Sequence, residues 1–202
     1  ASGKSIKNHI ISIGGQDIPF GWNYIFADKN IPELKIGIEI CEDLWVSTPP
    51  SNRLAECGAT IICNLSASDE VIGKAAYRRS LVQNQSARLV CGYIYADAGT
   101  GESTTDLIFA GHNIISENGT VLAESEKFTT GIIYGEIDIM RLASERRRMT
   151  TFQFNCSEIE TLTVNTVVKD IALTRKFSPT PFVPQDKTDL SACCEEILAM
   201  QA

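Results

Sequence analysis

The sequence has few basic residues and no long apolar run. Its 202 residues include 18 Lys and Arg against 25 Asp and Glu, so the formal net charge is −7 at pH 7. A nucleic-acid surface needs clustered Lys and Arg, and this balance therefore argues against one. The apolar runs are too short to cross a bilayer, and the first residues lack the apolar core of a signal peptide. These absences favour a cytoplasmic protein.

Histidine is also scarce, and the cysteines lack the spacing of a metal site. His9 and His112 are the only histidines, and neither stands with cysteines in a metal-ligand pattern. The seven cysteines are odd in number and include no pair separated by two residues, although Cys193 and Cys194 are adjacent. This usage fits reduced thiols better than a disulfide framework, and it predicts no metal site.

Apolar periodicity and turn residues predict two consecutive βαβ units. Strand, helix and strand are expected within residues 35–65, followed by a helix over 74–89 and a buried strand over 90–95. Strands joined in this way are parallel. In the second helix, Arg78 and Arg79 are expected on a solvated face or in a subunit contact.

The later part of the chain has a different pattern. Asn118-Gly119 between two apolar runs predicts a β-hairpin, and Gly131–Asp138 is expected to form a further strand. A short helix is expected to begin at or beside Asp138. The arginines at 146–148 near its end are predicted to form a surface or oligomer feature.

One segment carries a candidate nucleophile. Residues 35–40 read as a short strand, after which the chain turns polar at Cys41, Glu42 and Asp43. If the turn opens a helix, its backbone N–H groups favour the thiolate, and the next N–H can stabilise an oxyanion. This is the pattern of a nucleophile elbow. The alternative from these residues alone is a core cysteine that ends a strand.

Several motifs in the same order resemble the nitrilase (carbon–nitrogen hydrolase) superfamily. They are Gly-Ile-Glu-Ile-Cys-Glu-Asp-Leu-Trp at 37–45, Asn-Leu-Ser-Ala-Ser at 64–68, Gly-Lys-Ala-Ala-Tyr-Arg-Arg at 73–79, Gln-Ser-Ala-Arg at 85–88 and Gly-Thr-Gly-Glu-Ser-Thr-Thr-Asp-Leu at 99–107. The resemblance is close over about 35–151. The variant at 41–45 is similar to one branch, the glutaminase domains of glutamine-dependent NAD synthetases.

The resemblance implies a fold and a domain organisation. The expected fold class is α/β, the αββα sandwich of the superfamily, over residues 1–174 and incomplete at the N-terminus. Residues 175–202 are expected to be a Pro-rich linker and the start of a helix that leads to an absent synthetase domain.

The resemblance also assigns roles to five residues. Cys41 would attack the carboxamide of glutamine and form a thioester. Glu42 would contact the substrate α-amino group, and Ser68 and Lys74 its carboxylate. Trp45 would wall the pocket. The open alternatives are an exposed turn carboxylate for Glu42, a plain surface lysine for Lys74 and simple packing for Trp45.

Two catalytic residues of the family have no counterpart in this sequence. Nitrilase-like enzymes use a Glu base and a Lys, both upstream of the cysteine, but neither Glu33 nor Glu39, nor any upstream lysine, lies in the family's motif. We therefore expect this chain to be inactive by itself. No metal or cofactor is expected in it. ATP and Mg are expected only with a synthetase domain, because the Ser-Gly-Gly-x-Asp-Ser motif does not occur in this sequence.

The function implied is glutamine hydrolysis that supplies ammonia for the ATP-dependent amidation of deamido-NAD to NAD. The expected partners are glutamine, the synthetase domain and further copies of the chain, with no nucleic acid or membrane. Two alternatives stay open: a free-standing amidase, and a non-catalytic nitrilase-like assembly module.

Overall fold

The computed structural model of the chain describes residues 8–102, 106–152, 156, 158–184 and 186–201. It divides into two compact units, Ala1–Lys169 and Asp170–Ala202. The division falls slightly before the boundary expected from the sequence. The second unit holds helix α4 (Lys187–Gln201), in which no residue is buried.

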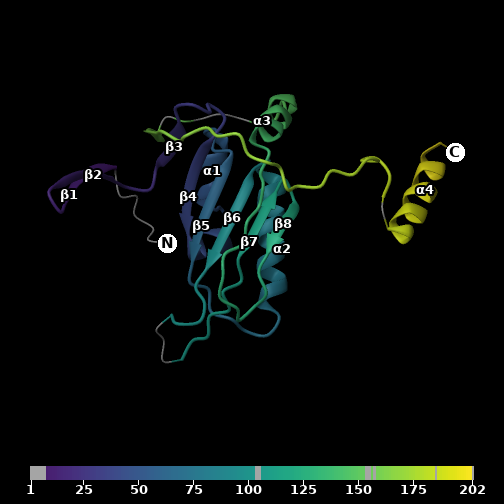
Figure 1. Cartoon of the computed structure of the whole chain (residues 1–202), viewed down its shortest axis with the longest axis horizontal. Helices are drawn as coiled ribbons and strands as arrows, with labels where there is room; N and C mark the ends of the chain where they lie inside the picture. The colour runs from purple at the N-terminus through teal and green to yellow at the C-terminus, as the bar shows by residue number, and fades with distance from the viewer. Residues whose placement is uncertain (1–7, 103–105, 153–155, 157, 185, 202) are drawn as a thin grey trace. The chain divides into compact units, whose positions relative to one another are not determined.

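The first unit is built on one large mixed sheet (Figure 1). Its strand order is β8-β7-β6-β5-β4-β3-β9. A separate two-stranded sheet precedes it, formed by β1 (His9–Ile13) and β2 (Gln16–Phe20). The strands of the large sheet are β3 (Tyr24–Asp28), β4 (Lys35–Ile40), β5 (Ile61–Ser66), β6 (Gly92–Asp97), β7 (Ile114–Glu117), β8 (Thr120–Glu124) and β9 (Glu160–Val164).

The centre of this sheet consists of the two predicted βαβ units. Strands β4, β5 and β6 are parallel and are joined through α1 (Pro50–Glu56) and α2 (Lys74–Arg88). Parallel strands have their carboxyl ends at the same edge of a sheet. The segments that follow β4, β5 and β6 therefore begin at one edge, and these segments include Cys41 and Ser68.

Helices α1 and α2 cover the same face of the sheet. Leu54 of α1 and Val82 of α2 belong to one buried apolar cluster with Ile62, Tyr93 and Ile114 of the strands. The sheet residues of this cluster lie on one face because side chains alternate along each strand. This layer of helices on a mixed sheet confirms the predicted α/β class.

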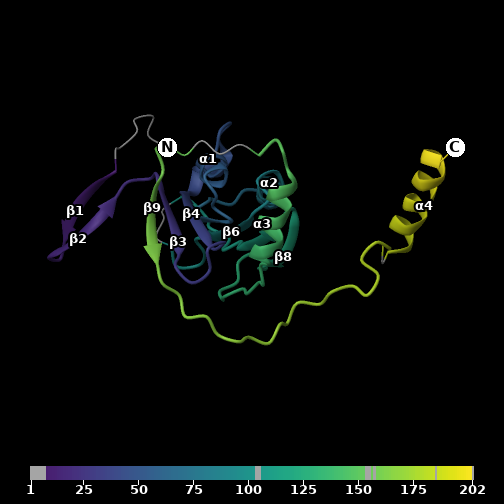
Figure 2. The same ribbon diagram turned by 90° about the horizontal axis from the view of Figure 1, so that it is seen from above.

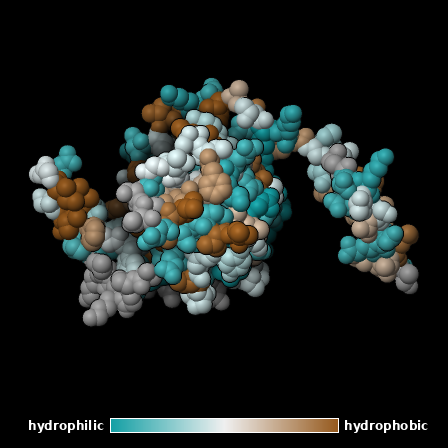
Figure 3. Space-filling model, turned by 90° about the horizontal axis from the view of Figure 1, so that it is seen from below, coloured by the Kyte–Doolittle hydropathy of each residue, from teal (hydrophilic) through white to brown (hydrophobic). Residues whose placement is uncertain are grey.

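The opposite face of the sheet is apolar and partly exposed. Ile38, Ile40 and Leu65 have exposed fractions of 38, 62 and 55%. Figure 2 shows the large sheet from above. Figure 3 shows the molecule from below, where hydrophobic and hydrophilic residues are interspersed on the surface. In an αββα sandwich the corresponding face packs against a second sheet.

The segment 131–138 is not the strand that its sequence pattern predicts. It has no regular secondary structure and packs over the sheet. A Cβ added at Gly92 would lie 2.8 Å from Ile137 Cδ1, and one added at Gly135 would lie 3.1 Å from Ile115 Cγ2. Because the segment packs against the face of the sheet, its backbone does not pair with a strand at the sheet edge.

The hairpin and the helix that follows it are confirmed. Asn118 and Gly119 join β7 to β8 with φ values of 44° and 85°, the left-handed values that a tight hairpin turn requires. Helix α3 (Ile139–Arg148) begins after Asp138, whose carboxylate accepts the Arg141 N–H at 2.9 Å.

The prediction for the arginine triplet is wrong at Arg146. Its guanidinium is buried and donates to the carbonyls of Ala59, Leu89 and Val90 at 2.7, 2.9 and 3.0 Å. These carbonyls follow or end α1 and α2, where backbone acceptors lack partners within the helix. The positive charge is therefore buried against the negative ends of two helices.

Candidate functional site

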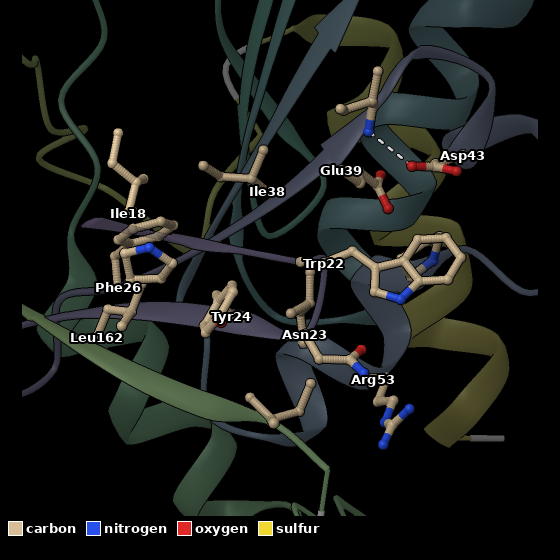
Figure 4. Close-up of a pocket in the computed structure, with 16 residues that line it drawn as sticks. Ile18, Trp22, Asn23, Tyr24, Phe26, Ile38, Glu39, Asp43, Arg53 and Leu162 are labelled. Atoms are coloured by element: carbon tan, nitrogen blue, oxygen red, sulfur yellow. Dashed lines mark hydrogen bonds between the residues drawn. The ribbon is translucent and has the colours of Figure 1, made fainter. Parts of the chain in front are cut away.

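The candidate nucleophile lies in a strained turn at the end of β4. The 3₁₀ helix η1 (Cys41–Trp45) begins at Cys41, whose φ is +52°. Few residues other than glycine adopt this left-handed conformation, and such outliers concentrate at functional sites. The Asp43 carboxylate accepts the Ile40 N–H at 2.8 Å across the turn (Figure 4). Leu44 is buried in the core and anchors η1 to the sheet.

The neighbouring strand holds Cys41 from the other side. Asn64 of β5 accepts the Cys41 N–H at 3.1 Å and donates to the Cys41 carbonyl at 3.3 Å. Cys41 as a whole is half-buried. The turn therefore presents a cysteine at the carboxyl end of a central parallel strand, as the sequence predicts for a nucleophile elbow.

Ser68 lies in the segment that follows β5 and is buried. Its N–H donates to Asp97 Oδ1 at 2.9 Å, and its hydroxyl accepts from Arg78 Nη2 at 3.4 Å. Burial raises the pKa of Asp97, although the Ser68 N–H and the positive charge of Arg78 partly oppose this shift. The segment is thus fixed to the end of β6 and to α2.

Lys74, the first residue of α2, lies beside Trp45. Its ammonium is 5.4 Å from the centroid of the Trp45 ring and 2.5 Å from Asp69 Oδ1. The hydrogen bond from Lys74 lowers the pKa of Asp69. Trp45 also packs against Tyr77 at a centroid distance of 5.4 Å. The Lys74 ammonium is therefore paired with the carboxylate of Asp69.

The structure brings together Trp45 and Lys74, which are far apart in sequence, and places Cys41 and Ser68 after adjacent parallel strands. Glu42 is exposed on η1.

The prediction for Arg78 is wrong. Its side chain is fully buried, forms an ion pair with Glu70 at 2.9 Å and contacts His112 Nδ1 at 3.0 Å. Because a guanidinium only donates, His112 Nδ1 accepts, and His112 Nε2 donates to Glu124 at 2.7 Å. The helical spacing of Arg78 from Val82, four residues later on the buried face, is the signal that would have identified it.

A cavity of about 500 Å³ lies next to the elbow (Figure 4). Its lining is mainly apolar and comes from β2, β3, β4, β9 and α1, and it includes Ile40 and Asp43. Cys41, Ser68 and Lys74 are not part of the lining. The cavity is therefore adjacent to the predicted site but separate from the residues assigned to it.

The part of the chain that the structure describes contains no group of three or more His, Cys, Asp and Glu placed to hold a metal ion. None of the helices in this part of the chain combines the length and apolarity that crossing a bilayer requires.

The chain belongs to the carbon–nitrogen hydrolase family, whose model matches residues 3–147. This confirms the family expected from the motifs.

Within this family the chain is similar to glutamine-dependent NAD(+) synthetases. That of Mycobacterium tuberculosis (strain H37Rv) is 42% identical over an alignment that covers 95% of this chain and 30% of the relative. That of Mycobacterium leprae is 41% identical with the same coverage. The chain thus spans 30% of the length of these curated relatives.

The chain is also similar to two solved structures. A glutamine-dependent NAD(+) synthetase from Cytophaga hutchinsonii is 29% identical over 60% of this chain and 18% of its own, with a TM-score of 0.49. A carbon–nitrogen hydrolase from Helicobacter pylori G27 is 22% identical over 56% of this chain and 43% of its own, with a TM-score of 0.48.

Proposed function

We propose that this chain is the glutamine-hydrolysing part of a glutamine-dependent NAD(+) synthetase. The observation that carries the proposal is the strained turn at Cys41, held at a strand end, in a chain that is 42% identical over 95% of its length to such synthetases. The ammonia released would serve the amidation of deamido-NAD to NAD.

In the proposed mechanism, Cys41 is the nucleophile. The thiol gives up its proton, its sulfur attacks the side-chain carboxamide of glutamine, and the C–N bond breaks as that proton passes to the departing nitrogen, which leaves as ammonia. Water then cleaves the thioester, releases glutamate and restores the thiol. We assign the family's Glu base and Lys to no residue of this chain, because buried Glu39 is occupied by bonds from Tyr93 and the Ser51 N–H.

The remaining roles follow from charge and position. Glu42, exposed on η1, would bind the ammonium of glutamine. Lys74 and Ser68 would bind the substrate carboxylate, with Asp69 holding the Lys74 ammonium over Trp45. We place no metal or cofactor in this chain. ATP and Mg would belong to a synthetase domain in the same protein, which we propose to be cytoplasmic and oligomeric.

Labelling with a diazoketone analogue of glutamine tests the proposal. The protein expressed from its complete reading frame is expected to be labelled once, at Cys41, and to release glutamate and ammonia from glutamine. Mass spectrometry of the peptide that contains Cys41 measures the labelling. Cys41→Ala is expected to lose both the labelling and the hydrolysis, whereas Cys63→Ala, at a half-buried cysteine of β5, keeps them. The 202-residue chain alone is expected to show no turnover.

Three other results would contradict the proposal. Absence of labelling would favour a non-catalytic assembly module. Hydrolysis of simple amides without preference for glutamine would favour a free-standing amidase. Labelling at another cysteine would remove the assignment of Cys41.

A further inference from the structure

We infer that Asn64 is a positioning residue that holds the nucleophile turn, and that Tyr93 and Glu39 fix the orientation of its amide. The inference rests on the proposed function, in which Cys41 is the nucleophile. Asn64, Tyr93 and Glu39 lie on three adjacent strands, β5, β6 and β4, on the face covered by the helices.

The turn at Cys41 needs an external support. The φ of +52° places a side-chain-bearing residue in a region that persists only where its surroundings enforce it. Asp43 holds the Ile40 N–H, so the residue before the turn is fixed. The backbone of Cys41 itself is held by Asn64.

A single amide meets both polar backbone groups of Cys41. Asn64 Oδ1 accepts the N–H at 3.1 Å, and Nδ2 donates to the carbonyl at 3.3 Å. Only a side chain with an acceptor and a donor next to each other makes both bonds. Asn64 is 1% exposed, so water does not compensate for a lost partner.

Tyr93 and Glu39 fix the orientation of the Asn64 amide. Asn64 Nδ2 also donates to the Tyr93 hydroxyl oxygen at 3.2 Å, and the Tyr93 O–H donates to Glu39. Burial, with the negative charge of Glu39, raises the pKa of Tyr93 well above 10.0, so the hydroxyl keeps its proton. Glu39 accepts the Ser51 N–H at 2.9 Å and links the network to the start of α1.

The network acts on the reacting atoms through the backbone. A change in φ at Cys41 moves both its sulfur and the N–H that follows it, and misplacement of a reacting group by about 1 Å can cost about 100-fold in rate. Ser68 and Lys74 are held by other partners, Asp97, Arg78 and Asp69. Loss of the network is therefore expected to lower kcat and to leave KM for glutamine nearly unchanged.

Variants of Asn64 test the inference in the protein expressed from its complete reading frame. Asn64→Leu removes both hydrogen bonds to the Cys41 backbone, and Asn64→Asp keeps the acceptor and loses the donor. Tyr93→Phe removes only the hydroxyl that holds the Asn64 amide. Asn84→Leu, an exposed asparagine on α2, is the matched control. The measurements are kcat and KM for glutamine, the second-order rate of Cys41 alkylation by iodoacetamide, and the urea unfolding midpoint.

Asn64→Leu is expected to lower kcat by about 100-fold with KM within about threefold of the wild type. It is also expected to slow alkylation of Cys41, because the sulfur is no longer held at the strand end. Asn64→Asp and Tyr93→Phe are expected to show smaller changes in the same direction, so that the conservative variant partly rescues kcat. Asn84→Leu is expected to match the wild type.

A folded Asn64→Leu protein with the kcat and alkylation rate of the wild type would overturn the inference. A parallel change of KM and kcat that follows the unfolding midpoint would also overturn it, because that pattern reports only stability. If Asn64→Leu does not fold, Asn64→Asp and Tyr93→Phe decide by the same readouts. If the wild type does not hydrolyse glutamine, the proposed function fails, and the alkylation rates alone decide whether Asn64 positions Cys41.

Discussion

At the residue scale, the protein buries charged side chains where several partners surround them. Arg78 is enclosed by Glu70, His112 and Ser68, and Arg146 by backbone carbonyls. Desolvation lowers the pKa of Arg146, but the group stays protonated because guanidinium pKa values are so high. Each arginine joins elements that are distant in sequence, so each is expected to contribute to stability.

Arg146→Met tests this contribution. The substitution leaves the carbonyls of Ala59, Leu89 and Val90 without their donor in a buried site, and we expect a loss of about 3 kcal/mol in the free energy of unfolding. Urea denaturation followed by circular dichroism measures it. Arg147→Met, at an exposed neighbour, is the control and is expected to change stability by less than about 0.5 kcal/mol. Equal stability of the two variants would refute the assigned role of Arg146.

At the element scale, one carboxylate joins the ends of strands β3 and β9. Asp28 accepts the N–H groups of Asn30, Ile31 and Thr166, each at 2.8 Å. The hydrogen bonds from Thr166, followed by those from Asn30 and Ile31, lower the pKa of Asp28 below its ordinary value of 3.8. A carboxylate whose folded-state pKa is lowered stabilises the protein above its unfolded-state pKa, and this stabilisation is lost as the pH falls through the folded-state value.

Asp28→Asn is therefore expected to act in a pH-dependent way. At pH 7 the variant is expected to have a lower urea midpoint than the wild type, because the charge-assisted bonds are weakened. Below pH 3.8 the difference is expected to shrink, since the wild-type carboxyl becomes protonated. Asp17→Asn, on exposed β2, serves as the control with no expected change. A difference that stays constant from pH 7 to pH 3 would contradict this account.

At the scale of the whole molecule, the chain consists of two compact units of very different size. Residues 175–184 of the second unit contain Pro179, Pro181 and Pro184 and have no helix or strand. Extended and exposed backbone of this kind is the preferred site of proteolysis. The first unit keeps its buried cluster within residues 25–114.

Limited trypsin digestion is expected to cut first after Arg175 or Lys176. The product that ends there is expected to keep the near-ultraviolet circular dichroism of the intact chain, because its aromatic core lies in the first unit. Mass spectrometry identifies the cut. Arg78 and Arg146, buried in the first unit, are the internal controls and are expected to resist. Early cleavage at either of them would show that the first unit is not independently stable.

The two βαβ units and the position of Cys41 at the end of a strand were predictable from the sequence because they depend on local signals. The left-handed turn at Asn118-Gly119 depends on two adjacent residues, and the strand before Cys41 depends on six. The prediction of a strand over 131–138 was wrong because an apolar segment packed on a sheet face has the same composition as a strand.

By itself, the sequence determined the two βαβ units, the hairpin and a cysteine at the end of a central strand, since alternation and turn chemistry act over a few residues. Only the tertiary structure decided that Arg78 and Arg146 are buried and that Asn64 holds Cys41. The partners of these groups lie 23 to 91 residues away, apart from Ser68 and Glu70, which lie 10 and 8 residues before Arg78. Whether a polar side chain is solvated or buried depends on such partners, because burial is favourable only when they replace the bonds to water.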